Sequence, residues 1–115
     1  MTDRIVLTMR AREQLRSVAT LVVGGVGSRL ELPYERMDDL QLALLSALDV
    51  VDGSEVSLEV DAGERGLAVA MGPLRTGSSA DAGLSRVLSP LVDELRYESR
   101  DGSEWLTLRL TSLAA

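Results

Sequence analysis

The chain has 115 residues, of which 45% are hydrophobic and 26% charged, so we expect residues 1–115 to form one domain that buries its own core. The net charge of −6 repels phosphate backbones and only 3% of the residues are aromatic, which argues against a nucleic-acid partner. Cys, His, Lys and Asn are absent, which excludes a thiolate nucleophile, an imidazole base, a usual zinc site and a P-loop.

The first third of the chain predicts a strand followed by a helix. Apolar side chains alternate over residues 5–9, which is typical of a strand with one buried face. From Ala11 the apolar spacing becomes helical, and we expect this amphipathic helix to end at Gly24, Gly25 and Gly27. These three glycines also faintly resemble a dinucleotide-binding loop, although they follow a helix and not a strand.

Residues 37–51 predict the central helix of the fold. One stripe of this segment is wholly apolar, with side chains that recur at three- and four-residue steps: Leu40, Leu44, Ala47, Leu48 and Val51. Leu42 and Leu45 make a second side apolar, so we expect the helix to be buried between layers.

The middle of the chain predicts a hairpin and a long loop. Strand-like runs over 55–60 and 67–71 flank a polar turn at 61–66. Residues 72–83 are small and flexible, and they predict either a lid or a disordered connection.

The C-terminal part predicts one more helix and a closing hairpin. Helical spacing of leucines and valines runs over 84–95, and Pro90 either kinks this helix or begins a second short one. Strands over 96–99 and 105–110 then flank an Asp-Gly turn at 100–103. The closing hairpin carries Tyr97 and Trp105, for which core packing or cross-strand pairing is the favoured interpretation.

This order of elements predicts an α+β fold. We expect a two-layer sandwich in which about three helices pack on one face of a mixed, mostly antiparallel sheet. The other face of the sheet would then remain open as a potential partner surface.

Three local sequences resemble the GHKL (Bergerat-fold) ATPases, in particular the small bacterial anti-sigma-factor serine kinases. The opening strand and helix are similar to the opening of that family, and the segment MDDLQLALLSALDVV is similar to its N-box helix. The closing Gly83-Leu84 with LVDELRYESRDGSEWLTLRL is similar to its last glycine box and closing hairpin. The resemblance spans nearly the whole chain and implies a histidine-kinase-like ATPase fold.

The resemblance also assigns the catalytic positions, and this chain departs from them. The family's general-base Glu falls on Ser46 and its Mg²⁺-binding Asn falls on Val50. Serine cannot act unaided as a base at neutral pH, and valine cannot ligate magnesium. Asp49 is the only acid nearby, and it reads otherwise as a charged helix-end residue in solvent.

The nucleotide-binding positions of that family are altered as well. The Asp that recognises adenine falls on Met71, and the alternative match Asp61-Ala62-Gly63 lies one strand too early. Loop residues that could line a phosphate, or could simply form a flexible connector, are Gly72, Arg75, Gly77 and Gly83. We therefore expect no cofactor and no metal, with ATP and Mg²⁺ as the alternative.

Three functional hypotheses follow. The first is a non-catalytic, anti-sigma-factor-like regulator that sequesters or modulates a sigma factor or its anti-anti-sigma-type antagonist. Its acidic surface would meet basic regions of the partner, through the open sheet face or the arginines of the first helix. The alternatives are an ATP-dependent protein serine kinase and a structural module, such as a homodimer formed through sheet edges. No apolar run reaches a membrane span and no signal core opens the chain, so we expect a bacterial cytoplasmic protein without a membrane partner.

Overall fold

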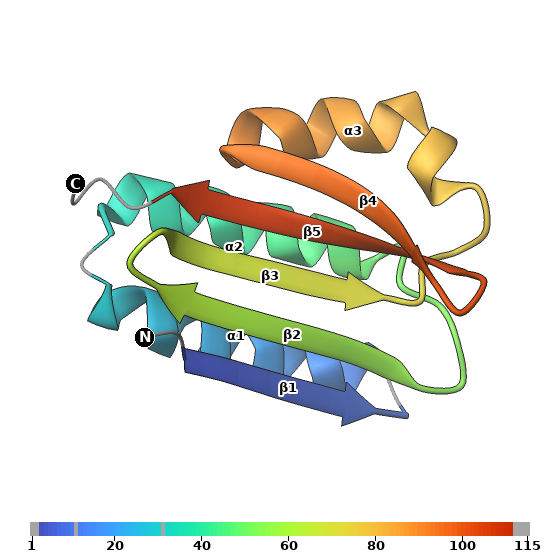
Figure 1. Ribbon diagram of the computed structural model, residues 1–115, viewed down its shortest axis with the longest axis horizontal. Coiled ribbons are helices and arrows are strands. Elements are labelled where there is room, and N and C mark those ends of the chain that lie inside the picture. Colours follow the sequence, from blue (N-terminus) through green and yellow to red (C-terminus); the bar gives the residue numbers. More distant parts are fainter. Residues whose placement is uncertain (1–2, 11, 31, 112–115) are drawn as a thin grey trace.

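A five-stranded sheet forms one layer of the molecule (Figure 1). The computed structural model describes residues 3–10, 12–30 and 32–111. The strands lie in the order β1-β2-β3-β5-β4, and every pairing between neighbours is antiparallel. Their bounds are β1 Asp3–Met9, β2 Val56–Gly63, β3 Gly66–Gly72, β4 Glu94–Arg100 and β5 Ser103–Thr111.

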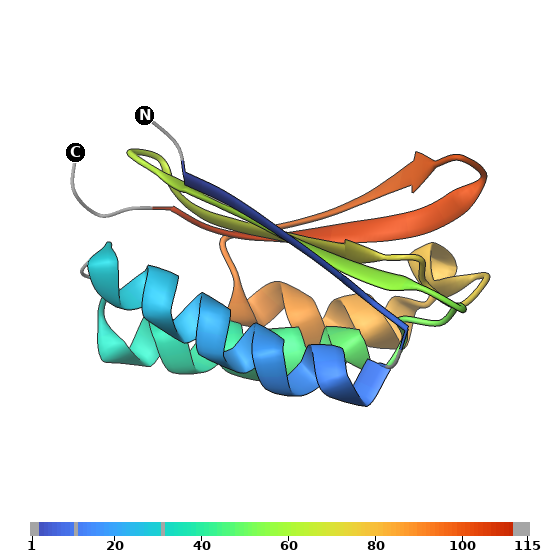
Figure 2. The same ribbon diagram turned by 90° about the horizontal axis from the view of Figure 1, so that it is seen from below.

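Three α-helices form the second layer and cover one face of the sheet (Figure 2). Their bounds are α1 Arg12–Arg29, α2 Tyr34–Leu48 and α3 Ala82–Leu88. A 3₁₀ turn precedes α3 at Ser78–Ala80, and another follows it at Ser89–Leu91. The prediction of a two-layer α+β fold with helices on one face is therefore confirmed. No helix in the described part of the chain is long and apolar enough to cross a membrane.

The sheet is wholly antiparallel over the described strands, so the expectation of a mixed sheet is wrong. The chain leaves β3, passes through α3 and returns in β4 parallel to β3, as in a split βαβ unit. The last strand, β5, inserts between these two and runs antiparallel to both. The potential parallel pair is thereby separated.

The core lies between the sheet and α2. The predicted apolar stripe is buried, with exposures of 1% or less for Leu40, Leu44, Ala47, Leu48 and Val51. The predicted bounds 37–51 are wrong, since α2 begins at Tyr34 and ends at Leu48, and Val51 lies after the helix in a bridge with Leu74. The second apolar side of α2 is not buried between layers, because the described fold has no layer beyond the helices. Leu42 is 55% exposed, and Leu45 is only half-buried.

Helix α1 continues through its glycines, which contradicts the prediction that it ends at Gly24, Gly25 and Gly27. A Cβ at Gly27 would overlap the Met37 side chain of α2, and one at Gly24 would lie 3.3 Å from Gln41 Nε2. These two glycines bring the helices close together. The interpretation as a dinucleotide loop fails for the same reason, since no loop exists there.

Pro90 lies in the first turn of the short 3₁₀ helix Ser89–Leu91, so the second of the two alternatives for this proline is correct. Leu95, which the helical spacing had included, lies in β4 and not in a helix. The Asp-Gly turn between β4 and β5 has positive φ at both residues, 51° at Asp101 and 81° at Gly102. This geometry matches the right-handed twist of the hairpin.

The open face of the sheet is polar. Arg100 extends from β4 across β5 and β3 to Glu59 on β2, with Nη1 2.8 Å from Oε2, and it stacks 4.2 Å from the ring centroid of Trp105. Arg4 of β1 lies 3.3 Å from the other oxygen of Glu59. The pKa of Arg100 lies above its ordinary value, chiefly because its side chain donates a hydrogen bond to Glu59. Charged side chains therefore cover the centre of this face.

Candidate functional site at the end of helix α2

Three arginines gather around the C-terminal end of α2. Asp49 caps this helix, and its carboxylate Oδ1 lies 2.7 Å from Arg16 Nη1. The backbone carbonyl oxygen of Asp49 accepts hydrogen bonds from Arg12 Nη1 at 3.2 Å and from Arg75 Nη2 at 3.1 Å. Cations are favourable at this position, because the helix dipole leaves partial negative charge on the last carbonyl groups. We call these residues the arginine cluster: Arg12, Arg16 and Arg75.

Two members of the arginine cluster keep most of their hydrogen-bonding capacity. Within the described residues, Arg12 and Arg75 pair with no carboxylate, and each donates only to a neutral carbonyl group. A guanidinium has five N–H donors in a planar fork that matches carboxylate and phosphate groups. The interpretation of Asp49 as a solvated charge is half right, since its side chain is 64% exposed but is ion-paired with Arg16.

The segment 72–75 is bound directly to the end of α2. The amide of Arg75 donates to the Val50 carbonyl at 2.7 Å, and the amide of Asp52 donates to the Pro73 carbonyl at 2.8 Å. Val51 and Leu74 form an antiparallel bridge between these bonds. The backbone of the segment therefore packs against the positions to which the resemblance assigns magnesium chemistry.

Ser46 and Val50 are both half-buried. The Ser46 carbonyl accepts the capping N–H of Asp49 at 3.3 Å, and Val50 packs against the core. Among the residues that the structure describes, no group of three or more acidic side chains is placed to hold a metal ion. Met71, at the position of the adenine-binding Asp, is fully buried in the core.

One carboxylate fixes the loop that follows β3. Glu104 of β5 accepts the amide of Gly77 at 2.6 Å and the amide of Ser79 at 2.8 Å. The pKa of Glu104 lies below its ordinary value, because the Ser79 side chain and then the two backbone amides donate hydrogen bonds to it. Ser78 is buried, and its hydroxyl donates to the Arg75 carbonyl at 2.6 Å. The prediction of a lid or a flexible connection is wrong, since these contacts hold the loop.

The other predicted loop residues do not come together around a phosphate. Gly72 lies beneath the ring of Trp105 on the open face of the sheet. The Gly77 amide is bound by Glu104, and the Gly83 amide is bound by Asp81 Oδ1 at 2.9 Å as part of the cap of α3. Both amides thus donate hydrogen bonds to carboxylates of the protein itself. The alternative match at Asp61 lines a separate cavity of about 370 Å³ at the β2–β3 turn.

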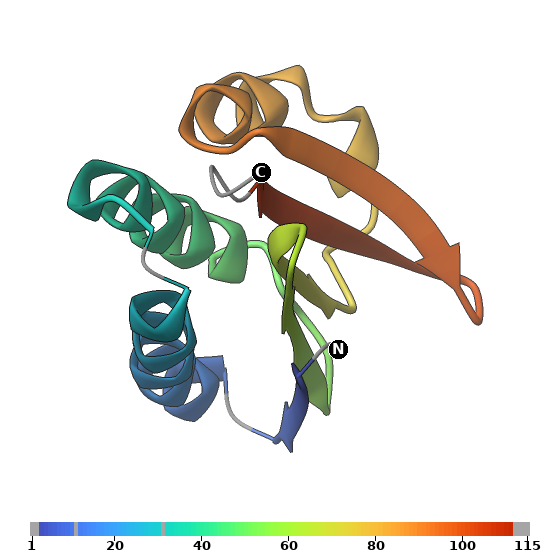
Figure 3. The same ribbon diagram turned by 60° about the vertical axis from the view of Figure 1, so that its left-hand side comes forward.

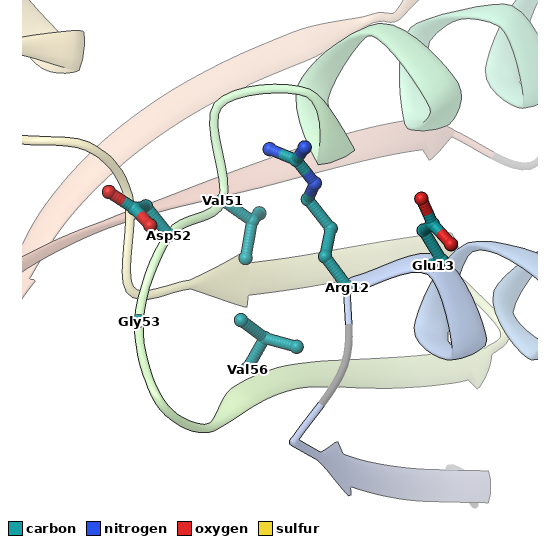
Figure 4. A pocket seen from close by; sticks show the side chains of 6 residues that line it. All are labelled: Arg12, Glu13, Val51, Asp52, Gly53 and Val56. Atoms are coloured by element: carbon teal, nitrogen blue, oxygen red, sulfur yellow. The ribbon is translucent and has the colours of Figure 1, made fainter.

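A cavity of about 290 Å³ lies beside the arginine cluster (Figure 4). Figure 4 shows Arg12 reaching toward the end of α2, with Val51 and Val56 below it and Asp52 across the opening. The remaining lining residues are Glu13 and Gly53. An apolar floor with donors and acceptors on its rim can accept a polar side chain of another molecule.

The sequence predicts the arginines of the first helix as partner contacts but does not single out Arg12. The pattern that indicates Arg12 is the concentration of arginines at the start of the first helix, where Arg10, Arg12 and Arg16 occur within seven residues. Nothing in the sequence indicated that residue 75 would join them.

The geometry defines a small two-layer α+β domain in which arginine and acidic side chains meet at the end of the central helix. No protein-family model matches the chain, and no curated protein matches it significantly.

Proposed function

We propose that this protein is a non-catalytic regulatory domain that acts by binding another protein. The observation that carries the proposal is the chemistry at the end of α2. The positions that would supply a general base and a Mg²⁺ ligand are Ser46 and Val50, and backbone hydrogen bonds join segment 72–75 to Val50 and Asp52. Neither side chain can perform those roles.

The partner we propose is a bacterial sigma factor or an antagonist of the anti-anti-sigma type. The resemblance of the sequence to the anti-sigma-factor kinases supports this choice, as does the net charge of −6, which complements a basic protein surface. The domain would regulate by sequestering this partner in the cytoplasm.

The contact we propose includes the arginine cluster and the adjoining cavity. Arg12 and Arg75 offer unpaired donors to a carboxylate of the partner, and Val51 and Val56 offer an apolar floor. The guanidinium groups of Arg12 and Arg75 would orient the partner, because charge complementarity at close range fixes register.

Capture of partners from the native host tests this proposal. We expect the tagged protein to retain a sigma factor or its antagonist, and Arg12→Ala with Arg75→Ala to reduce the retention. Arg86→Ala on α3 is the matched control, since Arg86 is exposed and distant in sequence from the cluster. Retention of neither partner class would contradict the proposal.

An ATP-dependent protein serine kinase is the second candidate. Arg12 at the cavity and Arg75 beside it favour this candidate, because guanidinium groups that pair with no carboxylate in the described part of the chain can bind phosphate. Isothermal titration with Mg-ATP separates the two candidates. We expect no heat of binding, whereas micromolar binding that Arg12→Ala abolishes would establish the nucleotide function instead.

A further inference from the structure

The two edges of the sheet differ in how they are protected. The β4 edge carries a charge at every second position on the open face, at Glu94, Arg96, Glu98 and Arg100. Helix α3 lies beside this strand (Figure 3), and Ser85 of α3 hydrogen-bonds to Tyr97 at 3.0 Å. Charges and covering helices are the usual devices that prevent an edge strand from pairing with another chain.

The β1 edge has few of these devices. No described helix or strand lies beyond it, and its register with β2 is unbroken from Asp3 to Met9, without a bulge (Figure 1). Four of its consecutive residues, Ile5, Val6, Leu7 and Thr8, favour the extended conformation or are apolar. A regular, apolar edge strand of this kind is a template for pairing.

Strand β1 also carries partly exposed apolar side chains on both faces, although Val6 is flanked by Arg4 and Thr8 on the open face. Val6 on the open face is 53% exposed. On the helix face Ile5, Leu7 and Met9 are only half-buried, whereas their neighbours on β2, Val56, Leu58 and Val60, are at most 1% exposed. The core therefore ends at β1 with apolar side chains that remain partly in contact with water.

We propose that β1 pairs with β1 of a second copy of this chain, antiparallel and centred on Val6. Residues directly opposite each other then have numbers that sum to twelve, so all seven residues of the strand are paired. Val6 faces Val6 of the second copy, Ile5 faces Leu7, and Arg4 faces Thr8. The two sheets join into one continuous sheet, and the apolar side chains of β1 gain neighbours on both faces.

Charge favours this register over its neighbour. Pairing centred on Leu7 would place Arg4 directly opposite Arg10 of the second copy, and like charges at opposite positions are unfavourable. Pairing centred on Ile5 would align only five of the seven residues. The register centred on Val6 avoids both costs.

Cysteine cross-linking tests the register, and the chain has no cysteine of its own. Val6→Cys places two thiols opposite each other, within the separation that a disulfide spans. Thr8→Cys is the matched control on the same face, because its two sites would be four residues, about 14 Å, apart along the strand. We expect a disulfide-linked dimer for Val6→Cys and not for Thr8→Cys. Equal cross-linking of both, or of neither, would overturn the proposal.

Light scattering of the full chain tests the association itself. We expect a mass of twice the 12.4 kDa of one chain, and a monomer for Val6→Arg, since two cations would then face each other. Val87→Arg is the control, because Val87 on α3 is also 53% exposed. A monomeric wild type, or a dimer that Val6→Arg leaves intact, would refute β1 pairing. The outcome is independent of partner capture and of nucleotide binding.

Discussion

Replacing Gly25 by alanine tests whether α1 passes through its glycines. A Cβ at this position has no atom within 4 Å, and Gly25 is not among the glycines with positive φ. Glycine in a helix interior costs about 1 kcal/mol relative to alanine. We therefore expect Gly25→Ala to raise the free energy of unfolding by about 1 kcal/mol and Tm by about 3–6 °C.

Thermal unfolding followed by circular dichroism measures this effect. Gly27→Ala in the same helix is the comparison, because its Cβ would overlap Met37 and part of the gain would be lost to repacking. If the helix instead ended at these glycines, alanine at residue 25 would meet a turn that favours glycine, and Tm would fall. A lower Tm for Gly25→Ala would refute the continuous helix.

Three further outcomes follow from individual contacts. Gly72→Ala should lower stability by about 1–3 kcal/mol and shift the fluorescence of the single tryptophan, because the new Cβ would lie 2.5 Å from Trp105 Cδ2. Glu104→Gln should destabilise the protein at neutral pH. The pKa of Glu104 is lower in the folded state, so its contribution to stability is complete above the unfolded pKa and is lost as pH falls through the folded pKa. The Tm values of the two proteins should therefore converge in acid. A difference in Tm that stays constant with pH would contradict this. Asp49→Ala should lower the free energy of unfolding by less than about 1 kcal/mol, because its ion pair is exposed. Leu44→Ala in the core should lower it by about 2–5 kcal/mol. Similar values for the two variants in denaturant unfolding would contradict this ranking.

Residue patterns predicted the elements whose faces differ in polarity. The apolar stripe of α2 predicts residues that the structure buries, and the alternation of β1 predicts the half-buried face formed by Ile5, Leu7 and Met9. The Asp-Gly turn was equally predictable, because few dipeptides accept positive φ at both positions. In each case the signal is local and acts within a few residues.

The same local rules failed where tertiary contacts override propensity. Gly24 and Gly27 favour a helix end, yet Gln41 and Met37 of α2 occupy the space that side chains would fill. Residues 72–83 have the composition of a flexible loop, yet one carboxylate from a strand 25 or more residues later binds two of their amides. The two partners of each contact lie too far apart in the sequence for a local pattern to include both.

The arginine cluster illustrates this limit at the candidate site. Arg12 and Arg16 belong to α1, Asp49 ends α2, and Arg75 follows β3, so their sequence separations reach 63 residues between Arg12 and Arg75. They meet because α1 begins beside the end of α2, and because segment 72–75 pairs with residues 50–52. The resemblance directed attention to Ser46 and Val50, which lie within two turns of this point. The resemblance therefore points to the end of α2, whereas the guanidinium donors of the candidate site, Arg12 and Arg75, come from α1 and from the segment after β3.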